Sequence, residues 1–184
     1  GQQAIIAHID IDPAEIGKVV QTTIPIVADA KAALTQLLRY PAEELDCKEW
    51  LNRCQKRKKE HPYRYDREET KEIKPQKLIE EVGRLTKGEA VIVTDVGQHQ
   101  MWVAQYYPFR FPKQLITSGG LGTMGYGIPA GIGAKFACPE KKIVVFVGDG
   151  GFQMTNQEFA LLNDYGLDVK FILMNNRSLG MVRQ

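Results

Sequence analysis

The chain has 184 residues, of which 43% are hydrophobic and 25% charged, and its net charge at pH 7 is +2. These values are typical of a globular protein with a sizeable core, and so small a net charge gives no basis for binding to nucleic acid or to a membrane surface. The sequence has no apolar run of membrane-spanning length and no signal peptide. Its three cysteines, Cys47, Cys54 and Cys138, are scattered and lack zinc-site spacing, and such free or buried thiols suit a reducing cytosol.

The two ends of the sequence also bear on its interpretation. The chain begins at Gly1 without Met and stops at Gln184 inside a recognisable motif, so we expect a fragment. The predicted location is cytoplasmic. An organelle version stays open, because a targeting segment would precede the first residue given.

Residues 1–39 predict the C-terminal end of a Rossmann-like domain. Residues 4–12 begin as an apolar run and then alternate Ile with Asp, as the end of a strand does. Residues 24–28 predict a second short strand. We expect Asp29 to be the N-cap of a helix over 30–39, because its carboxylate can accept hydrogen bonds from the first free N–H groups of a helix.

Residues 40–75 differ in composition and predict an interdomain linker. The segment 53–61 is rich in Lys and Arg, acids follow closely at 66–69, and apolar periodicity is weak. This mixture predicts a solvated, partly helical segment. Nucleic-acid binding by the basic run is the less favoured alternative, because aromatic and basic residues do not interleave on a predicted sheet.

The remaining residues, 76–184, predict βαβ repeats that form a parallel sheet with helices on both faces. The expected elements before the central motif are a helix over 77–85 ended by Lys87-Gly88, a strand over 90–94, and a Gly- and Ala-rich helix over 123–136 that can pack closely on the sheet. The residues of the first helix expected to face inward are Leu78, Ile79, Val82 and Leu85.

Two short apolar runs, 143–147 and 169–174, are bounded by Gly or Asn and predict buried strands. Thr155 and Glu158 between them have the spacing of a capping box. This spacing predicts a helix over 156–165, with Phe159 and Leu162 facing the sheet and Gly166 as its C-terminal stop.

Polar residues follow both of these strands directly. Gly148-Asp149-Gly150 and Asn175-Asn176 are separated by 24 residues. Parallel strands joined by a helix end at the same edge of the sheet, so we expect Asp149 and the Asn pair to lie side by side there. Carboxylate and amide oxygens are hard donors that suit Mg²⁺ holding a diphosphate.

Three other segments, 94–102, 117–125 and 180–184, complete a recognisable order of motifs. Together with the Gly-Asp-Gly and Asn-Asn pair they resemble acetohydroxyacid synthase (acetolactate synthase), in the catalytic subunit of its biosynthetic, flavin-containing type. This family uses thiamine diphosphate (ThDP), also called thiamine pyrophosphate. The resemblance runs over nearly the whole chain and is weakest over about 40–75.

The resemblance implies a role for individual residues. In the family an Asp, the second Asn of the pair and a backbone carbonyl two residues later bind Mg²⁺, which here gives Asp149, Asn176 and the carbonyl of Ser178. The other implied cofactor-binding positions are Val96, Gly97, Gln98, His99, Gly122, Met124, Gly148, Gly150, Gly151, Gly180, Met181 and Val182. Many family members have Ser at position 151, so one bond to phosphate is expected to be lost in this chain.

Met124 matches the large apolar residue that keeps ThDP bent, so that the cofactor's own 4′-imino group deprotonates C2. By spacing alone a core methionine is the favoured explanation for Met124, and the resemblance reverses this preference. The alternative explanation for His99 is a hydrogen-bonded loop histidine. The glutamate that bonds the aminopyrimidine in the family lies in the N-terminal domain of another subunit. This sequence therefore contains only part of the implied active site.

Three acids near the N-terminus match family positions close to the adenosine half of FAD, namely Asp10, Glu15 and Asp29. An acid at a strand end can bond ribose hydroxyls. The family's common Gly-Asp-Ala is Ala28-Asp29-Ala30 here. Solvated acids at strand ends are the alternative explanation for all three.

The implied activity of the intact enzyme is ThDP- and Mg²⁺-dependent condensation of pyruvate with pyruvate or 2-oxobutyrate. The products are acetolactate or acetohydroxybutyrate, for branched-chain amino acid biosynthesis. The implied partners are a second catalytic subunit, in a dimer or tetramer, and a small regulatory subunit, and the fragment alone is expected to be inactive. FAD is a further cofactor of the intact enzyme that the resemblance allows.

Other functions stay open at this point. The nearest alternative is another ThDP enzyme, such as pyruvate oxidase, a 2-oxo acid decarboxylase or catabolic acetolactate synthase, because the metal motif is shared. A dinucleotide-binding oxidoreductase is less favoured, since Gly131-Ile132-Gly133 lies inside a predicted helix and lacks the third Gly of GxGxxG. A non-catalytic module is the third alternative.

Overall fold

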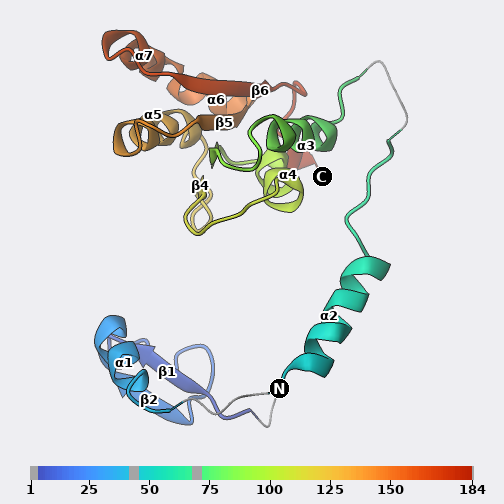
Figure 1. Ribbon diagram of the computed structural model, residues 1–184. Coiled ribbons are helices and arrows are strands. Elements are labelled where there is room, and N and C mark those ends of the chain that lie inside the picture. Colours follow the sequence, from blue (N-terminus) through green and yellow to red (C-terminus); the bar gives the residue numbers. More distant parts are fainter. Residues whose placement is uncertain (1–3, 42–45, 68–71, 184) are drawn as a thin grey trace. The chain divides into compact units, whose positions relative to one another are not determined.

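The computed structural model describes residues 4–41, 46–67 and 72–183 of the chain (Figure 1). Parts of the predicted linker, residues 42–45 and 68–71, lie outside these ranges, as do the chain ends. The chain divides into two compact units, residues 1–61 (unit 1) and 62–184 (unit 2). The predicted linker spans the boundary between them.

Unit 1 contains a two-stranded parallel sheet in which Ala7 pairs with Ile24 and Asp10 with Val27. Its elements are β1 (Ala7–Asp10), β2 (Ile24–Val27), α1 (Ala30–Leu37) and α2 (Lys48–Glu60). The predicted N-cap is confirmed, since the Asp29 carboxylate accepts from the Ala32 N–H at 3.0 Å. No residue of unit 1 within the described ranges is buried.

Unit 2 contains a four-stranded sheet in which every strand pair is parallel, in the order β4-β3-β5-β6. Its strands are β3 (Val91–Thr94), β4 (Leu115–Thr117), β5 (Ile143–Gly148) and β6 (Val169–Met174). Its helices are α3 (Pro75–Leu85), α4 (Gln98–Tyr106), α5 (Gly127–Ala137), α6 (Asp149–Thr155), the 3₁₀ helix η1 (Asn156–Phe159), α7 (Ala160–Asp164) and α8 (Gly180–Arg183). The predicted α/β class with a parallel sheet is confirmed.

Helices cover both faces of this sheet, because alternate residues of each strand point to opposite sides. On one face Ile92, Val144 and Phe146 pack with residues of α3 and α4. On the other face Val93 and Val145 pack with α5. The central strands β3 and β5 are therefore buried on both sides, which explains their continuous runs of β-branched residues.

The glycines of α5 allow the close packing that the sequence predicts. A β-carbon on Gly131 would overlap the side chain of Val145, and one on Gly127 would lie 2.8 Å from the Asp95 nitrogen. Both positions face the sheet, so only glycine lets the helix backbone approach the strands this closely. The helix is shorter than predicted, since residues 123–126 form a turn before it.

The predicted helix over 156–165 is wrong in its start. Helix α6 already begins at Asp149, and the following residues form η1 and then α7. No capping bond is made by Thr155, whose hydroxyl instead donates to the carbonyl of Gly125 at 2.9 Å. The predicted stop is confirmed, because Gly166 has a φ of 59° and the Leu167 N–H donates to the Leu162 carbonyl as in a Schellman motif.

Two further details differ from the sequence predictions. Leu85 was expected to face inward but is 67% exposed, because it is the last residue of α3 and Lys87-Gly88 turn the chain away with positive φ. The helix α4 and the short strand β4 have weak periodicity and were not predicted. Helix α4 matters most for the site, because it begins at Gln98.

Candidate functional site

The central motif lies at the carboxyl edge of the sheet, where β5 and β6 are neighbours. Gly148 is paired in register with Met174, the last residue of β6. Asp149 and Asn175 are therefore the first residues beyond two adjacent strands. The predicted juxtaposition of the Gly-Asp-Gly and Asn-Asn segments is confirmed in the fold of unit 2.

These segments line one cavity of about 770 Å³. Almost all predicted cofactor-binding residues surround it, namely Val96, Gly97, Gln98, His99, Met124, Gly148, Asp149, Gly150, Gly151, Asn176, Ser178, Gly180, Met181 and Val182. Gly122 is not among the lining residues. Trp102, Leu78 and Pro75 add apolar surface that the motifs did not predict.

The Asn pair shapes the turn that follows β6. The Asn175 side-chain oxygen accepts from the Arg177 N–H and that of Asn176 from the Ser178 N–H, each at 3.0 Å. Arg177 has a φ of 54°, in the left-handed region. The residues of these Asx turns, Asn176 and Ser178 among them, line the same cavity as Asp149.

Met124 and Leu179 approach each other over Gly150. A β-carbon on Gly150 would lie 2.7 Å from Leu179 Cδ2 and 3.2 Å from Met124 Cε. A side chain at the position after Asp149 would therefore displace the ends of these two apolar side chains. Met124 is half-buried and lines the cavity.

His99 lies in the first turn of α4 and is only 6% exposed. Its Nε2 is the one buried side-chain nitrogen or oxygen, within the residues described, that has no hydrogen-bond partner. Burial lowers the pKa of His99, against the opposing effect of the carboxylates of Asp95 and Asp149. A neutral imidazole with an unpaired nitrogen at the cavity wall fits a group that bonds a ligand.

Asp95 is a buried polar residue of the site to which the sequence analysis gave no role. It follows β3, is fully buried, and accepts from the N–H groups of Val96, Gly125 and Gly127. Its place directly after a strand was visible in the sequence, but its distant partners were not. The bonds to Gly125 and Gly127 fix the turn that carries Met124.

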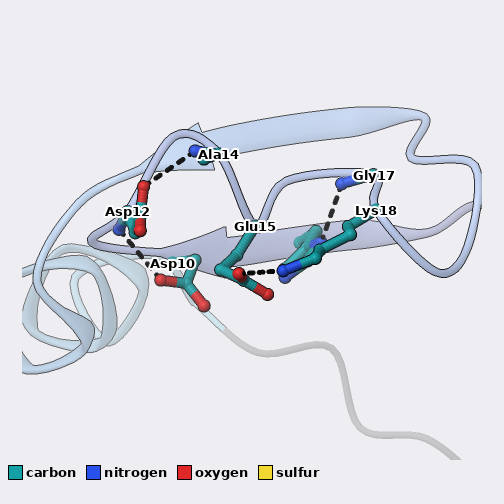
Figure 2. A network of polar contacts seen from close by, with 7 residues as sticks. Asp10, Asp12, Ala14, Glu15, Gly17 and Lys18 are labelled. Carbon is teal, nitrogen blue, oxygen red and sulfur yellow. Dashed lines mark hydrogen bonds and ion pairs between the residues drawn. The ribbon is translucent and has the colours of Figure 1, made fainter.

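The three acids that the resemblance assigns to FAD, Asp10, Glu15 and Asp29, make local contacts, and those of Asp10 and Glu15 are drawn in Figure 2. Asp10 accepts from the Asp12 N–H at 2.9 Å, and Glu15 pairs with Lys18 at the surface. Asp29 caps α1. Figure 2 shows Asp10 at the end of β1 and Glu15 in the loop that follows this strand.

Comparison with known proteins supports this assignment of motifs. Residues 95–184 match the family described as "Thiamine pyrophosphate enzyme, C-terminal TPP binding domain". The acetolactate synthase large subunit of Lactococcus lactis subsp. lactis (strain IL1403) is 58% identical over 183 residues, which are 100% of this chain and 32% of that protein. The chain belongs to the acetolactate synthase large-subunit family of thiamine pyrophosphate enzymes.

Other members of the acetolactate synthase family show the same extent of similarity. The isozyme 3 large subunit of Escherichia coli (strain K12) is 46% identical over 98% of this chain. Acetolactate synthase 1, chloroplastic, of Oryza sativa subsp. japonica is 47% identical over 99% of it. The chain spans about a third of these relatives, 32% and 29% of their lengths.

Within the described residues, no helix is long and apolar enough to cross a membrane.

The residues around the cavity fit ThDP with a divalent cation. Across the part of the chain that the structure describes, no group of three or more His, Cys, Asp or Glu could bind a metal. A cation beside Asp149 would therefore take one carboxylate, then amide and backbone oxygens, and complete its shell with diphosphate and water. The unpaired His99 nitrogen offers a polar partner for that diphosphate.

Proposed function

We propose that this chain forms part of a longer enzyme that condenses pyruvate with pyruvate or 2-oxobutyrate, with ThDP and Mg²⁺ as cofactors. The products are acetolactate and acetohydroxybutyrate, precursors in branched-chain amino acid biosynthesis. The observation that carries the proposal is the convergence of Asp149, Asn176 and Ser178 on one cavity at the ends of β5 and β6. The names of the relatives, all acetolactate synthases, support the reaction.

Each group around the cavity has a proposed part in holding the cofactor. Asp149, Asn176 and the carbonyl of Ser178 would hold Mg²⁺ together with the diphosphate, and Gln98 and His99 would donate hydrogen bonds to its terminal phosphate. When bound, ThDP supplies the electron sink for decarboxylation, and the protein supplies binding and orientation. Helix α6 begins at Asp149, so its first backbone N–H groups would be available to the same diphosphate.

Met124 is proposed to keep the two rings of the cofactor bent. Its side chain reaches Gly150, beside the proposed metal ligand, and an unbranched thioether can fill the irregular space between two rings. The carbonyl of Gly122, two residues earlier, is proposed to accept from the aminopyrimidine. Gly180, Met181 and Val182 of α8 also line the cavity and are proposed to close over the cofactor.

The remaining partners belong to the longer enzyme. We expect a second catalytic subunit in a dimer or tetramer, because the family's glutamate comes from another subunit, and a small regulatory subunit. Asp10, Glu15 and Asp29 of unit 1 are proposed to contact FAD, and Asp10 and Asp29 each use one carboxylate oxygen in a local bond. The proposed location is the cytoplasm. The rice relative is named chloroplastic.

The test is product analysis with the full-length enzyme that carries this chain. With pyruvate, ThDP and Mg²⁺ we expect acetolactate, and with added 2-oxobutyrate also acetohydroxybutyrate. Asp149→Ala should abolish both products, whereas Asp164→Ala, which removes an exposed carboxylate on α7, should leave them unchanged. Acetaldehyde or acetyl phosphate as the main product would instead assign the chain to a decarboxylase or a pyruvate oxidase.

A further inference from the structure

Asp95 is a fully buried carboxylate whose hydrogen bonds go to backbone N–H groups. Its Oδ1 accepts from Val96 at 2.8 Å and from Gly125 at 3.1 Å, and its Oδ2 accepts from Gly127 at 2.7 Å. No ion pair to Asp95 occurs within the described ranges. Burying a carboxylate away from water costs free energy, and these three charge-assisted hydrogen bonds offset that cost. The backbone groups that donate them are therefore held close to Asp95.

The turn that receives these bonds is also held from its other side. The Gly125 carbonyl accepts from the Thr155 hydroxyl at 2.9 Å, at the end of α6. Gly125 has a φ of 85°, and a β-carbon on it would lie 3.1 Å from Met154 Cβ and from Thr155 Cγ2. The turn that carries Met124 is therefore fixed between the end of β3 and the end of α6.

The start of α6 packs on the same carboxylate. A β-carbon on Gly151 would overlap Asp95 Oδ1 and lie 2.7 Å from its Cγ. Gly151 is two residues after Asp149, the proposed metal ligand. Asp95 thus touches both the turn that carries Met124 and the helix that carries Asp149, although it does not line the cavity itself.

From this geometry we infer that Asp95 is a positioning residue that sets the distance between Met124 and the proposed metal site. The inference rests on the proposed function, because it assigns Met124 and Asp149 to one bound cofactor. Through its two carboxylate oxygens, Asp95 holds the Met124 turn in register with α6. Glycine at position 151 follows from the same contact, since the Ser common elsewhere in the family would need the carboxylate to move.

The first test is Asp95→Asn in the full-length enzyme. The amide keeps the size of the side chain but turns one acceptor into a donor that faces a backbone N–H group. At saturating ThDP and Mg²⁺ we expect kcat to fall by about tenfold or more, and the near-ultraviolet circular dichroism of the bound cofactor to change. A kcat within about twofold of the wild-type value, with an unchanged cofactor spectrum, would overturn the inference.

A second variant covers the case in which Asp95→Asn does not fold. Thr155→Val removes the other tether of the turn without exposing a buried charge, and should lower kcat at saturating ThDP by about threefold. Its matched control is Thr35→Val, which removes a hydroxyl that donates to Lys31 within α1. Thr155→Val with the kcat and cofactor spectrum of the control would count against the inference.

Coupling to Met124 separates positioning from a general loss of stability. The loss of kcat in Asp95→Asn, or in Thr155→Val, should be non-additive with that in Met124→Leu, because both act through one turn. Additive losses would contradict the inference. If the wild-type enzyme binds ThDP but makes no acetolactate, only the proposed function is overturned. The inference about Asp95 can still be tested then, because the spectrum of the bound cofactor is measured without turnover.

Discussion

Each unit has a parallel sheet with acids just beyond its strands, yet the two edges differ. In unit 2, Asp95 and Asp149 follow strands buried on both faces, and their segments meet at a cavity. In unit 1, Asp10 and Asp29 end β1 or follow β2, and their carboxylates accept from N–H groups two and three residues further along the chain. Similar residues at similar positions thus have different surroundings.

The comparison shows that an acid at a strand end supports a ligand site only where helices pack on the sheet and fix its strands next to one another. The core of unit 2 fixes β5 and β6 side by side, so two segments with 24 residues between them in the sequence line one cavity. Unit 1 has no buried residue in its described part to fix its strands in the same way. Its acids therefore carry a weaker argument for a ligand.

The largest expected effect is a loss of folding stability when the hydrophobic core of unit 2 is disrupted, because this core fixes the strands that end at the cavity. Phe146 is fully buried in the cluster that contacts α3 and α4, and Phe146→Ala should lower the free energy of unfolding of unit 2 by about 3–5 kcal/mol. Urea unfolding followed by Trp102 fluorescence, in a Trp50→Phe background, measures this unit. Phe136→Ala is the control: its ring is half-exposed beside Tyr165, and it should cost about 1 kcal/mol.

The second effect concerns the space over Gly150. Gly150→Ala would place a methyl group between Met124 and Leu179 and should weaken ThDP binding by about tenfold. Gly133→Ala is the matched control, since nothing lies within 4 Å of a β-carbon there and the site is on the exposed side of α5. Calorimetric titration of both variants in the full-length enzyme would refute the cavity assignment if their affinities were equal.

The third prediction tests whether Asp29 in unit 1 only caps α1 or also contacts FAD. Asp29→Ala should destabilise α1 by about 1 kcal/mol, because it removes the N-cap, whereas Asp29→Asn should retain the cap. Helicity and thermal unfolding of the chain measure this. FAD titration of the full-length enzyme then separates the two explanations: weaker binding in Asp29→Asn, with α1 intact, supports contact with the flavin.

The smallest effect is a pH dependence. Burial lowers the pKa of His99 below its ordinary value of 6.5. As the pH falls below about 6.5, His99 therefore takes up a proton in the unfolded chain before it does so in the folded chain. The stability of unit 2 without metal should therefore fall as the pH drops below about 6.5, and His99→Gln should reduce that fall. Urea unfolding at several pH values measures this, with the exposed His61→Gln as control. Equal pH profiles for His99→Gln and the wild type would contradict the prediction.

The sequence predicted the parts of the fold that depend on local patterns. The runs at β3, β5 and β6 are strands, Asp29 caps α1 and Gly166 ends α7, because hydrophobic period, caps and glycine act over a few residues. The capping box at Thr155 failed for a tertiary reason. The Thr155 hydroxyl bonds the Gly125 carbonyl, 30 residues away, and α6 had already begun at Asp149.

The candidate site was predictable where family motifs name its residues, and not where contacts between distant segments define them. The motifs placed Asp149, Asn176 and Met124 at one cavity correctly. They gave no role to Asp95, whose partners lie 30 and 32 residues further on. The close approach of Gly151 to that carboxylate is likewise visible only in three dimensions.

The central claim is that the ends of β5 and β6 bind Mg²⁺ and the diphosphate of ThDP. The most direct measurement is calorimetric titration of ThDP into the full-length enzyme, with Mg²⁺ and with a chelator, for the wild type, Asp149→Ala and the control Asp164→Ala. The account predicts that Mg²⁺ strengthens binding to the wild type and the control, and that Asp149→Ala in Mg²⁺ binds as weakly as the wild type in chelator. Wild-type, Mg²⁺-dependent affinity in Asp149→Ala would contradict it.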